Sequence, residues 1–526
     1  MTSTLIAALT SLLLSALSCG DAAASPGGGR VVAPQAAAQQ DPAPAPSRVL
    51  FVTQSAGYEH GVVKRASPGQ LAVAERGLSA ALADSADSAD SADSAGPGYA
   101  LRITQDASQL PALLPELDAV VFYTTGELPL SEAERAALLD WVADGGAFVG
   151  LHCASDTMYA SPAYLDMLGG TFDGHPWHQE VTLKVEWPEH PALAHLPPSW
   201  TLTDEIYQFR AFERWPNVVL LSLSGERAEL SKGKRADGDY ASAWCKPYGR
   251  GRVFYTALGH RPELWNDERF LAHVRGGLDW ALKGPDLPAP PPQGAVVLVG
   301  ADGPDRGAWS HRDGGPFRWA VGGAPGADAR AAGGADASAD GGAGGAGGGI
   351  GAATVAAQAA GAGEMTVLDT GAGDLVSQRA FGDTLIHVEF MLPTGHEGRG
   401  NSGVYVQGRY ELQVIDPSTA ETPDVGTCGA VYGVAGPSRA AIRAAGVWQT
   451  YDIRFRAPRF DASGARTAAA RLSLWHNGIR VHDELELPDV TPGGIAQNEA
   501  AMGPLMLQDH GDPVRYRNIW VAPLRD

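Results

Sequence analysis

The stretch GNSGVYVQGRYELQVID, residues 400–416, decides how the C-terminal half of the chain is interpreted. It contains two runs, residues 403–407 and 410–416, in which Val, Ile and Tyr alternate with other side chains. Gly408 and Arg409 separate the two runs. This pattern predicts two adjacent antiparallel strands joined by a tight turn.

The two predicted strands each carry a polar face. Successive side chains of a strand point to opposite faces, so Glu411 and Gln413 share one face, and Tyr405 and Gln407 share one face of the neighbouring strand. This arrangement indicates a sheet with a buried apolar back and a polar front that suits a sugar. An ordinary solvated outer face of a sheet has the same pattern, so the pattern alone leaves both interpretations open.

The bulk composition limits the classes of function. The chain has 526 residues, enough for several domains, and a formal net charge of -21. Such acidity argues against nucleic acid as a main partner, because phosphate binding needs a basic surface. The chain has only four cysteines, so it is not a disulfide scaffold.

The N-terminus is typical of an export signal. Residues 5–17 are apolar but too few to span a bilayer, and small residues precede Cys19, as in a bacterial lipoprotein signal. We therefore expect a signal peptide over residues 1–19, a lipid anchor on Cys19 at the outer membrane or cell surface, and a disordered tether over residues 20–47. The alternative is a plain secretory signal, which gives a periplasmic or secreted protein.

Residues 48–284 alternate strand and helix patterns, which predicts a doubly wound, mostly parallel α/β sheet. In the clearest helix, Ser131 and Glu134 form a capping box before an apolar stripe, and two glycines end it. An Asp-Ser-Ala repeat at residues 84–95 is interpreted as a surface insertion. The predicted strands cover residues 48–53, 119–123, 147–152, 218–223 and 252–258.

Three histidines follow predicted strands of this domain. His60, His152 and His260 are far apart in sequence, but the carboxyl ends of parallel strands meet at one edge of a sheet. One interpretation is a divalent metal held by these three histidines, although their spacing matches no standard zinc motif. The other is structural hydrogen bonding by each histidine.

The motifs of this domain resemble those of the trehalose-utilisation (ThuA-like) family. They are GGAFVGLHCASDT (145–157), LGGTF (168–172), HPWH (175–178), DEIYQF (204–209) and GRVFYTALGH (251–260). The resemblance implies a glutamine-amidotransferase-like fold and a role in the metabolism of trehalose-like disaccharides. The residues expected at its site are His60, His152, Cys153, His178, Asp204, Glu205 and His260.

The resemblance also raises a weaker alternative, amidotransferase-like chemistry at Cys153. Amidotransferases place a nucleophilic cysteine at a sharp turn between a strand and a helix. In this sequence His152 occupies that position, and Cys153 follows one residue later.

A Pro-rich linker is predicted at residues 285–294, followed by a second domain over residues 295–526. Within it, residues 322–363 are mostly Gly, Ala and Asp and are interpreted as a disordered insertion. Eight short strand patterns without a long helix predict a β-sandwich or jelly roll. These strands are expected at residues 385–392, 403–407, 410–416, 449–456, 470–476, 479–486, 504–508 and 515–522.

The second domain resembles the 3-keto-disaccharide hydrolase family. The matching motifs are FGD (381–383), HVEF (387–390), GRGNSGVYVQGRYELQVID (398–416), CGAVYG (428–433), WQTYD (448–452) and LQDHGDPVRYRNIW (507–520). The resemblance implies a concanavalin-like fold of two sheets and cleavage of glycosidic bonds in 3-keto-sugars.

A 3-keto group acidifies the hydrogen on C2, so a base, an electrophile and an acid suffice for elimination at C1. The expected catalytic residues are Glu411, His510, Glu389 and Asp509. The expected substrate-binding residues are Gln407, Gln413, Tyr405, Asn401 and Arg517. The turn at residues 509–512 also fits a purely structural role.

The sequence therefore predicts an exported carbohydrate-active protein that acts on 3-keto-disaccharides or 3-keto-glycosides. Its substrate would come from an upstream sugar 3-dehydrogenase. The alternative is a non-catalytic glycan-binding lipoprotein, because a fold of this kind does not by itself imply catalysis.

Overall fold

A computed structural model of the chain describes residues 45–83, 98–284, 288–321, 364–366, 372–417 and 422–524. The signal peptide, Cys19, the tether up to residue 44, and the insertions predicted at residues 84–95 and 322–363 lie outside these ranges. Within the described ranges, no helix combines the length and the apolar character needed to cross a membrane.

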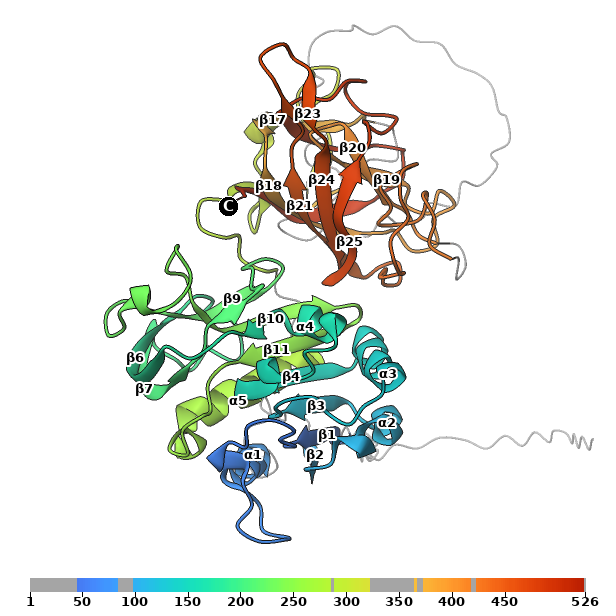
Figure 1. Cartoon of the computed structure of the whole chain (residues 1–526). Coiled ribbons are helices and arrows are strands. Elements are labelled where there is room, and N and C mark those ends of the chain that lie inside the picture. The colour runs from blue at the N-terminus through green and yellow to red at the C-terminus, as the bar shows by residue number, and fades with distance from the viewer. Residues whose placement is uncertain are drawn as a thin grey trace, which may run out of the picture. The chain divides into compact units, whose positions relative to one another are not determined.

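The N-terminal part is built on a nine-stranded sheet in the order β2-β1-β3-β4-β11-β10-β9-β6-β7 (Figure 1). The first five strands of this order are parallel, and the remaining neighbours are antiparallel. The predicted α/β fold is confirmed. The strands are β1 (Ser47–Val52), β2 (Tyr99–Thr104), β3 (Ala119–Phe122), β4 (Ala147–Leu151), β6 (Trp177–Val185), β7 (Ser199–Ile206), β9 (Val218–Leu223), β10 (Ala241–Tyr248) and β11 (Gly251–Thr256), with a separate pair β5 (Thr171–Phe172) and β8 (Phe209–Arg210).

Helices cover both faces of this sheet, because the strand side chains alternate between two apolar layers. Val49 and Phe51 belong to the same core cluster as Leu78 of α1, whereas Leu50 belongs with Leu138 of α3. The predicted capping box of α3 is present, with Ser131 and Glu134 bonded reciprocally. The helices are α1 (Val73–Ala83), α2 (Leu110–Leu113), α3 (Glu132–Ala143), α4 (Pro162–Leu168) and α5 (Glu268–Lys283).

The C-terminal part is a sandwich of two antiparallel sheets, as predicted. The larger sheet has the order β13-β12-β27-β18-β21-β24-β25, with β16 also paired to β27, and the smaller has the order β14-β17-β26-β19-β20. The strands are β12 (Val296–Gly300), β13 (Gly303–Pro304), β14 (Trp309–His311), β15 (Ala320–Val321), β16 (Glu364–Thr366), β17 (Leu375–Phe381), β18 (Thr384–Met391), β19 (Ser402–Val406), β20 (Tyr410–Val414), β21 (Trp448–Arg456), β22 (Arg459–Phe460), β23 (Arg466–Ala468), β24 (Ala470–His476), β25 (Ile479–Leu487), β26 (Gly503–Leu507) and β27 (Arg515–Pro523).

The period of two along each strand separates core from outer face. Val404 and Leu412 of the smaller sheet pack in the core with Val388 of the larger sheet. Their neighbours in sequence, such as Glu411 on β20 and Glu389 on β18, therefore lie on the two outer faces of the sandwich. Because stacked sheets are about 10 Å apart, those two outer faces cannot form one site.

Candidate functional sites

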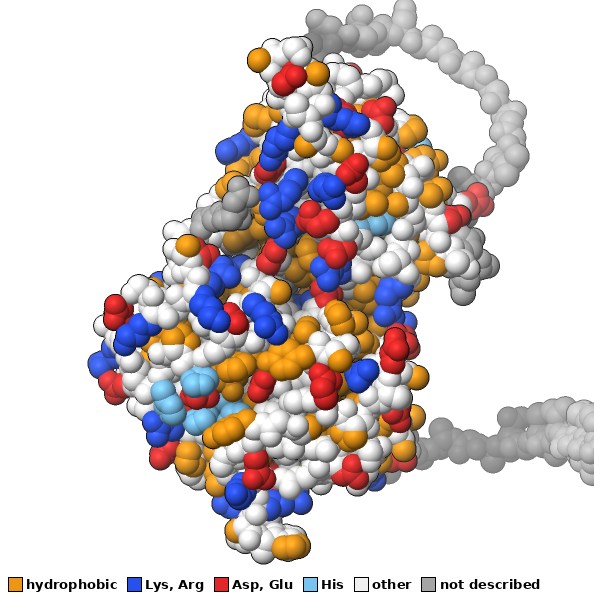
Figure 2. All heavy atoms as spheres, viewed as in Figure 1, with side chains coloured by type: hydrophobic (Ala, Val, Ile, Leu, Met, Phe, Trp, Pro, Cys, Tyr) orange, Lys and Arg blue, Asp and Glu red, His pale blue; other side chains and the backbone are white. Residues whose placement is uncertain are grey.

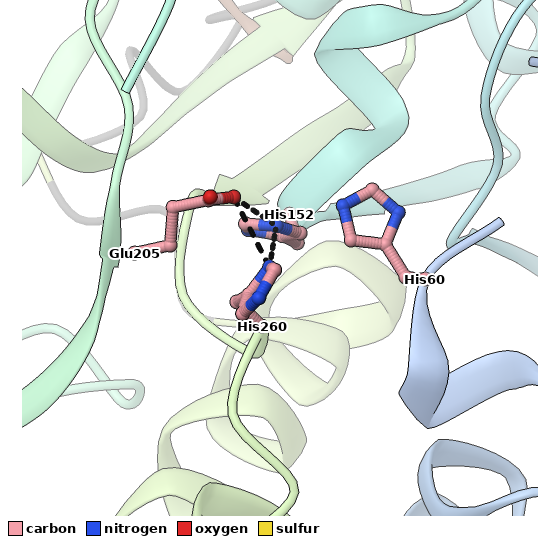
Figure 3. A group of neighbouring side chains, drawn as sticks. All are labelled: His60, His152, Glu205 and His260. Carbon is pink, nitrogen blue, oxygen red and sulfur yellow. Dashed lines mark hydrogen bonds and ion pairs between the residues drawn. The ribbon is translucent and has the colours of Figure 1, made fainter. Parts of the chain in front are cut away.

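The three predicted histidines converge at the carboxyl edge of the parallel sheet. His60 follows β1, His152 follows β4, and His260 follows β11, while Glu205 reaches the same point from β7 (Figure 3). One ligand atom from each of the four residues lies within 4.8 Å of the others. The sheet topology thus collects side chains that are up to 200 residues apart (60 to 260) into one cluster.

Three atoms of this cluster form a nearly regular triangle. His152 Nε2 lies 3.3 Å from His260 Nδ1, and Glu205 Oε2 lies 3.4 Å and 3.1 Å from these two nitrogens, respectively. The dashed lines of Figure 3 join these atoms, and the His60 ring faces them from the opposite side. The Nδ1 atom of His60 is buried without a hydrogen-bond partner.

His152 occupies the turn at which an amidotransferase would carry its cysteine. Its φ is 44°, a left-handed conformation that is costly for a residue with a side chain and is often found at functional sites. Its Nδ1 lies 2.6 Å from the carbonyl oxygen of Ala257. Cys153 is 1% exposed and lies in the apolar core, and burial raises the pKa of its thiol well above the usual value. The thiol is therefore not available as a nucleophile at this edge of the sheet.

Asp204 positions the loop that carries His260. Its two carboxylate oxygens accept hydrogen bonds from the backbone N–H groups of Gly259 (2.7 Å) and Arg261 (3.0 Å), which bracket the histidine. The hydroxyl of Tyr123 donates to the carbonyl of Gly259 from the other side. Asp204 therefore acts on the site through the backbone, and Glu205 is the member of the pair that faces the histidines.

The cluster is buried at its base and open at its rim. His60 and His152 are 4% and 0% exposed, respectively. The side chains of His175 and His178 are exposed, and their Nδ1 atoms lie 3.3 Å and 3.9 Å from Glu205 Oε1. Figure 2 shows histidine side chains gathered at one place on the surface of this part of the chain.

The charges of the cluster are coupled. Burial, together with the neighbouring His152 and His260, lowers the pKa of His60 to about 3. Burial by itself would raise the pKa of Glu205, but hydrogen bonds from His152 and His260 outweigh it, so its pKa lies below the usual range. A hydrogen bond to Glu205 raises the pKa of His260.

A second polar cluster lies on the outer face of the smaller sheet of the sandwich. Tyr405 and Glu411 are directly paired across β19 and β20, and the Tyr405 hydroxyl donates to Glu411 Oε2 at 2.7 Å. Gln508, at the end of β26, donates from Nε2 to the same hydroxyl at 3.1 Å, and its Oε1 is buried without a partner. Gly403 leaves the room for Glu411, because an added Cβ would lie 2.7 Å from Glu411 Oε1.

The Glu411 carboxylate is tuned toward neutral pH. Its pKa is raised to about 7, mainly by burial; the hydrogen bond from Tyr405 opposes this rise and the charge of Asp374 adds to it. A carboxylate with such a pKa can take up a proton near neutral pH, as a general base must.

A loop covers this cluster. Thr491 Oγ1 accepts from the backbone N–H of Glu411 at 2.8 Å, and the Tyr405 hydroxyl lies 3.1 Å from the carbonyl of Pro492. Arg312 holds the same loop through the carbonyls of Gly493 and Gly494. As a result, Glu411 is only 4% exposed.

The other residues predicted for the sandwich site are placed in different ways. Gln413 donates to Asn401 Oδ1 at 3.0 Å on the polar face. Gln407 lies beyond the end of β19 with φ 52°, and its side chain bonds the carbonyls of Phe381 and Ala501 instead of facing Glu411. Asp509 accepts from the N–H groups of Gly373 and Gly511, which fits the structural turn. His510 is exposed.

Glu389 and Arg517 are not brought together with Glu411. They are paired at 2.6 Å on the outer face of the larger sheet, where His387 lies 3.5 Å from Glu389 Oε1 and 2.6 Å from Asp452 Oδ1. The Arg517 guanidinium lies over the Trp448 ring, 4.1 Å from its centre. The grouping of Glu389 and Arg517 with Glu411 is corrected for this reason: β18 and β27 belong to the other sheet.

Two residues of these clusters, Gln508 and Tyr58, were not identified as site residues from the sequence. Gln508 lies in a predicted strand, yet its place beside Tyr405 follows from the pairing of β19 with β26, which no local pattern shows. Tyr58 is 68% exposed beside His60, with ring centres 4.9 Å apart. Its position in the segment GYEH (57–60), close to a predicted site histidine, is a signal that could have identified it.

Comparison with known families gives a match for each of the two domains. Residues 48–281 match the family ThuA, described as trehalose utilisation, and residues 301–522 match the 3-keto-alpha-glucoside-1,2-lyase-like domain. The chain is a ThuA domain followed by a 3-keto-disaccharide hydrolase-like domain. No curated protein matches the chain.

Solved structures resemble parts of the chain. One is a candidate glycosyl hydrolase from Parabacteroides distasonis that is 28% identical. The match covers 44% of this chain and 85% of the hydrolase chain, with a TM-score of 0.34. Another is a candidate ThuA-like protein from Bacteroides uniformis, 24% identical, which covers 47% of this chain and 96% of its own, with a TM-score of 0.38. The two family matches indicate a carbohydrate-related function.

Proposed function

We propose that the 3-keto-disaccharide hydrolase-like domain cleaves the glycosidic bond of 3-keto-glycosides by elimination followed by hydration, with Glu411 as the base. The observation that supports this proposal most is the buried Glu411 carboxylate on a polar sheet face beside the Tyr405 hydroxyl, where burial raises its pKa to about 7. Glu389 is a poorer base, because its neighbours lower its pKa to about 2.

The proposed reaction needs no oxidant and no ordinary pair of glycosidase carboxylates. Glu411 takes the proton from C2, whose acidity the 3-keto group increases, and the electron pair forms an enolate. The bond from C1 to the glycosidic oxygen then breaks, the leaving oxygen takes the proton from Glu411 directly or through water, and a 1,2-double bond remains. Addition of water across that bond gives the free 3-keto-sugar.

The polar side chains around Glu411 have defined roles in this proposal. Tyr405 keeps its proton, since burial and the neighbouring Glu411 raise its pKa, and it orients the carboxylate. In this proposal the amides of Gln413 and Gln508 bond sugar hydroxyls or the enolate oxygen. Substrate entry requires the loop at residues 491–495 to move, because that loop covers Glu411 in this conformation.

The decisive experiment is release of 3-keto-glucose from 3-keto-trehalose or a 3-keto-glucoside by the full chain. Glu411→Gln keeps the size of the side chain but removes the base, so kcat should fall by about 10²–10⁴-fold. Glu486→Gln, which alters an exposed carboxylate on β25, is the matched control and should retain wild-type turnover. Turnover that survives Glu411→Gln would remove Glu411 from the proposal.

A non-catalytic glycan-binding role is the second candidate. The closed loop over Glu411 favours it, because a site that binds without reaction needs no open path to the carboxylate. If the wild-type chain binds a 3-keto-glucoside but releases no 3-keto-glucose, the second candidate replaces the first.

Export and substrate supply complete the proposal. A sugar oxidised at C3 must be made before this reaction, so a sugar 3-dehydrogenase would act upstream. The short apolar N-terminal run and Cys19 support export with a lipid anchor. Labelling of the wild-type chain, but not of Cys19→Ser, by a fatty-acid analogue in cells would test the anchor.

A further inference from the structure

The histidine cluster of the ThuA domain contains a close contact of three polar atoms that either protons or a cation can satisfy. A carbonyl oxygen only accepts, so the 2.6 Å contact to Ala257 places a proton on His152 Nδ1 and leaves a lone pair on Nε2 of the neutral ring. That lone pair faces Glu205 Oε2 at 3.4 Å and His260 Nδ1 at 3.3 Å. A proton on Nε2 would join His152 to Glu205 by a hydrogen bond, and without that proton the lone pair can bind a cation.

A cation at the centre of the triangle satisfies all three atoms. Zinc binds imidazole nitrogens and carboxylate oxygens at about 2.0–2.2 Å, which sets the edges of a tetrahedral ligand set at about 3.3–3.5 Å. The observed edges are 3.3, 3.4 and 3.1 Å. The fourth residue, His60, is 4% exposed and has a buried Nδ1 without a partner.

Residues around the cluster hold its histidines in fixed orientations. Asp204 fixes the loop of His260 through two backbone hydrogen bonds, and Ala257 fixes the orientation of the His152 ring. Such outer partners orient metal ligands in proteins. The backbone of His152 is also left-handed, and strained backbone of this kind is concentrated at functional sites.

From this geometry we infer that the ThuA domain binds one divalent transition-metal ion, preferentially zinc, through His60, His152, Glu205 and His260. Imidazole and carboxylate ligands suit this class of ion. The site is separate from Glu411, which lies on the β-sandwich. The ThuA domain would therefore bind metal independently of the Glu411 site.

The ligand of this metal is a polyhydroxylated carbonyl compound, namely a keto-sugar, and this choice rests on the proposed function of the second domain. A metal ion polarises a carbonyl oxygen as a Lewis acid. The rim of the cluster offers the exposed Tyr58 ring beside His60 and the exposed imidazoles of His175 and His178. An exposed aromatic ring with polar groups around it suits the face and hydroxyls of a sugar.

The metal site is tested with the full chain after removal of bound metal by dipicolinate. Titration with Co²⁺ should give tetrahedral cobalt absorption that saturates at about one ion per chain, and Zn²⁺ should displace it. Glu205→Gln and His152→Ala should weaken binding by about 100-fold or more. The matched control is His195→Ala, an exposed histidine of the same domain that bonds the Arg269 carbonyl, and it should bind as wild type.

Folding of the variants is followed separately. Glu205→Gln preserves shape, so its metal-free thermal transition should match that of the metal-free wild type, whereas added Zn²⁺ should raise the transition of the wild type only. A wild-type chain that takes up no Co²⁺ or Zn²⁺ at micromolar concentrations would overturn the site, as would equal binding by Glu205→Gln and His195→Ala.

The ligand class is tested on the cobalt-loaded chain. A 3-keto-glucoside should change the cobalt spectrum, and the corresponding glucoside should not. Tyr58→Ala should weaken that response without loss of the metal. An unchanged spectrum would overturn the keto-sugar assignment. Glu411→Gln should load metal as the wild type does, so failure of glycoside cleavage and failure of the metal site are distinguishable.

Discussion

Two buried glutamates on opposite faces of the β-sandwich show how neighbours decide the role of a carboxylate. Glu411 is 4% exposed and meets a tyrosine hydroxyl, and its pKa is about 7. Glu389 is also 4% exposed but meets Arg517, Asn518 and His387, and its pKa is about 2. Equal burial thus gives opposite shifts of the pKa.

The difference teaches that burial alone does not identify a catalytic base. Glu389 stays ionised because a guanidinium, an amide and an imidazole all donate to it, and its network includes Asp452, which helps to raise the pKa of His387 to about 9. Such a network stabilises one arrangement of side chains. Glu411 has one strong donor and retains the capacity to exchange a proton near neutral pH.

The largest effect on stability is expected for Glu389→Gln. Removal of this charge leaves Arg517 and His387 without their shared anion, and loss of one partner of a buried ion pair costs about 3–5 kcal/mol. Urea denaturation at pH 7 measures the free energy of unfolding. Glu411→Gln is the matched control and should not destabilise the protein; similar losses in both variants would contradict the comparison.

The pH dependence of stability should differ between wild type and Glu411→Gln. The folded protein binds the Glu411 proton more tightly than the unfolded chain, whose ordinary pKa is 4.5. This contribution is therefore complete below pH 4.5 and is lost as the pH rises through 7. The variant cannot ionise, so its stability relative to wild type should increase over that range by up to about 3 kcal/mol, at about 1.4 kcal/mol per pKa unit.

Other titrating groups do not affect this comparison. The raised pKa of His387 makes the stability of both proteins fall as the pH rises from 6.5 through 9, and this effect cancels in the difference. Denaturation of both proteins between pH 4.5 and 8.5 gives the measurement. A constant difference over this range would show that the pKa of Glu411 is not raised.

The fold could be predicted from the sequence because its signals are local. Alternation along β19 and β20 identified the hairpin, and the Ser131–Glu134 capping box identified the start of α3. The antiparallel strands β6 and β7 were not predicted as strands. Their alternation is present in the sequence, as VTLKV at residues 181–185 and SWTLT at residues 199–203, so the local signal could have identified both strands.

The site was predictable only where strand ends imply convergence. His60, His152 and His260 could be grouped because parallel strands share one carboxyl edge. The grouping of Glu389 with Glu411 was wrong because alternation assigns a residue to a face but not to a sheet of the sandwich. The place of Gln407 was also not predictable, since its left-handed backbone ends the alternation at the turn.

The smallest effect is expected when Glu411 loses the hydrogen bond from the Tyr405 hydroxyl. Tyr405→Phe removes the hydroxyl that donates to Glu411 Oε2 at 2.7 Å, so the pKa of Glu411 should rise above about 7. A hydrogen bond to a charged group contributes about 1.5–3 kcal/mol, so the acidic limb of the pH profile of kcat should move up by about one pH unit. The plateau at high pH should change little.

The matched control for this variant is Tyr410→Phe, which removes a buried hydroxyl that donates to Glu499 instead of Glu411. Its pH profile should remain that of the wild type. If Tyr405→Phe leaves the acidic limb in place, Tyr405 does not set the pKa of Glu411. If it instead lowers the plateau by about 100-fold, Tyr405 itself transfers a proton in the reaction, and the base would be a pair of residues on the polar face.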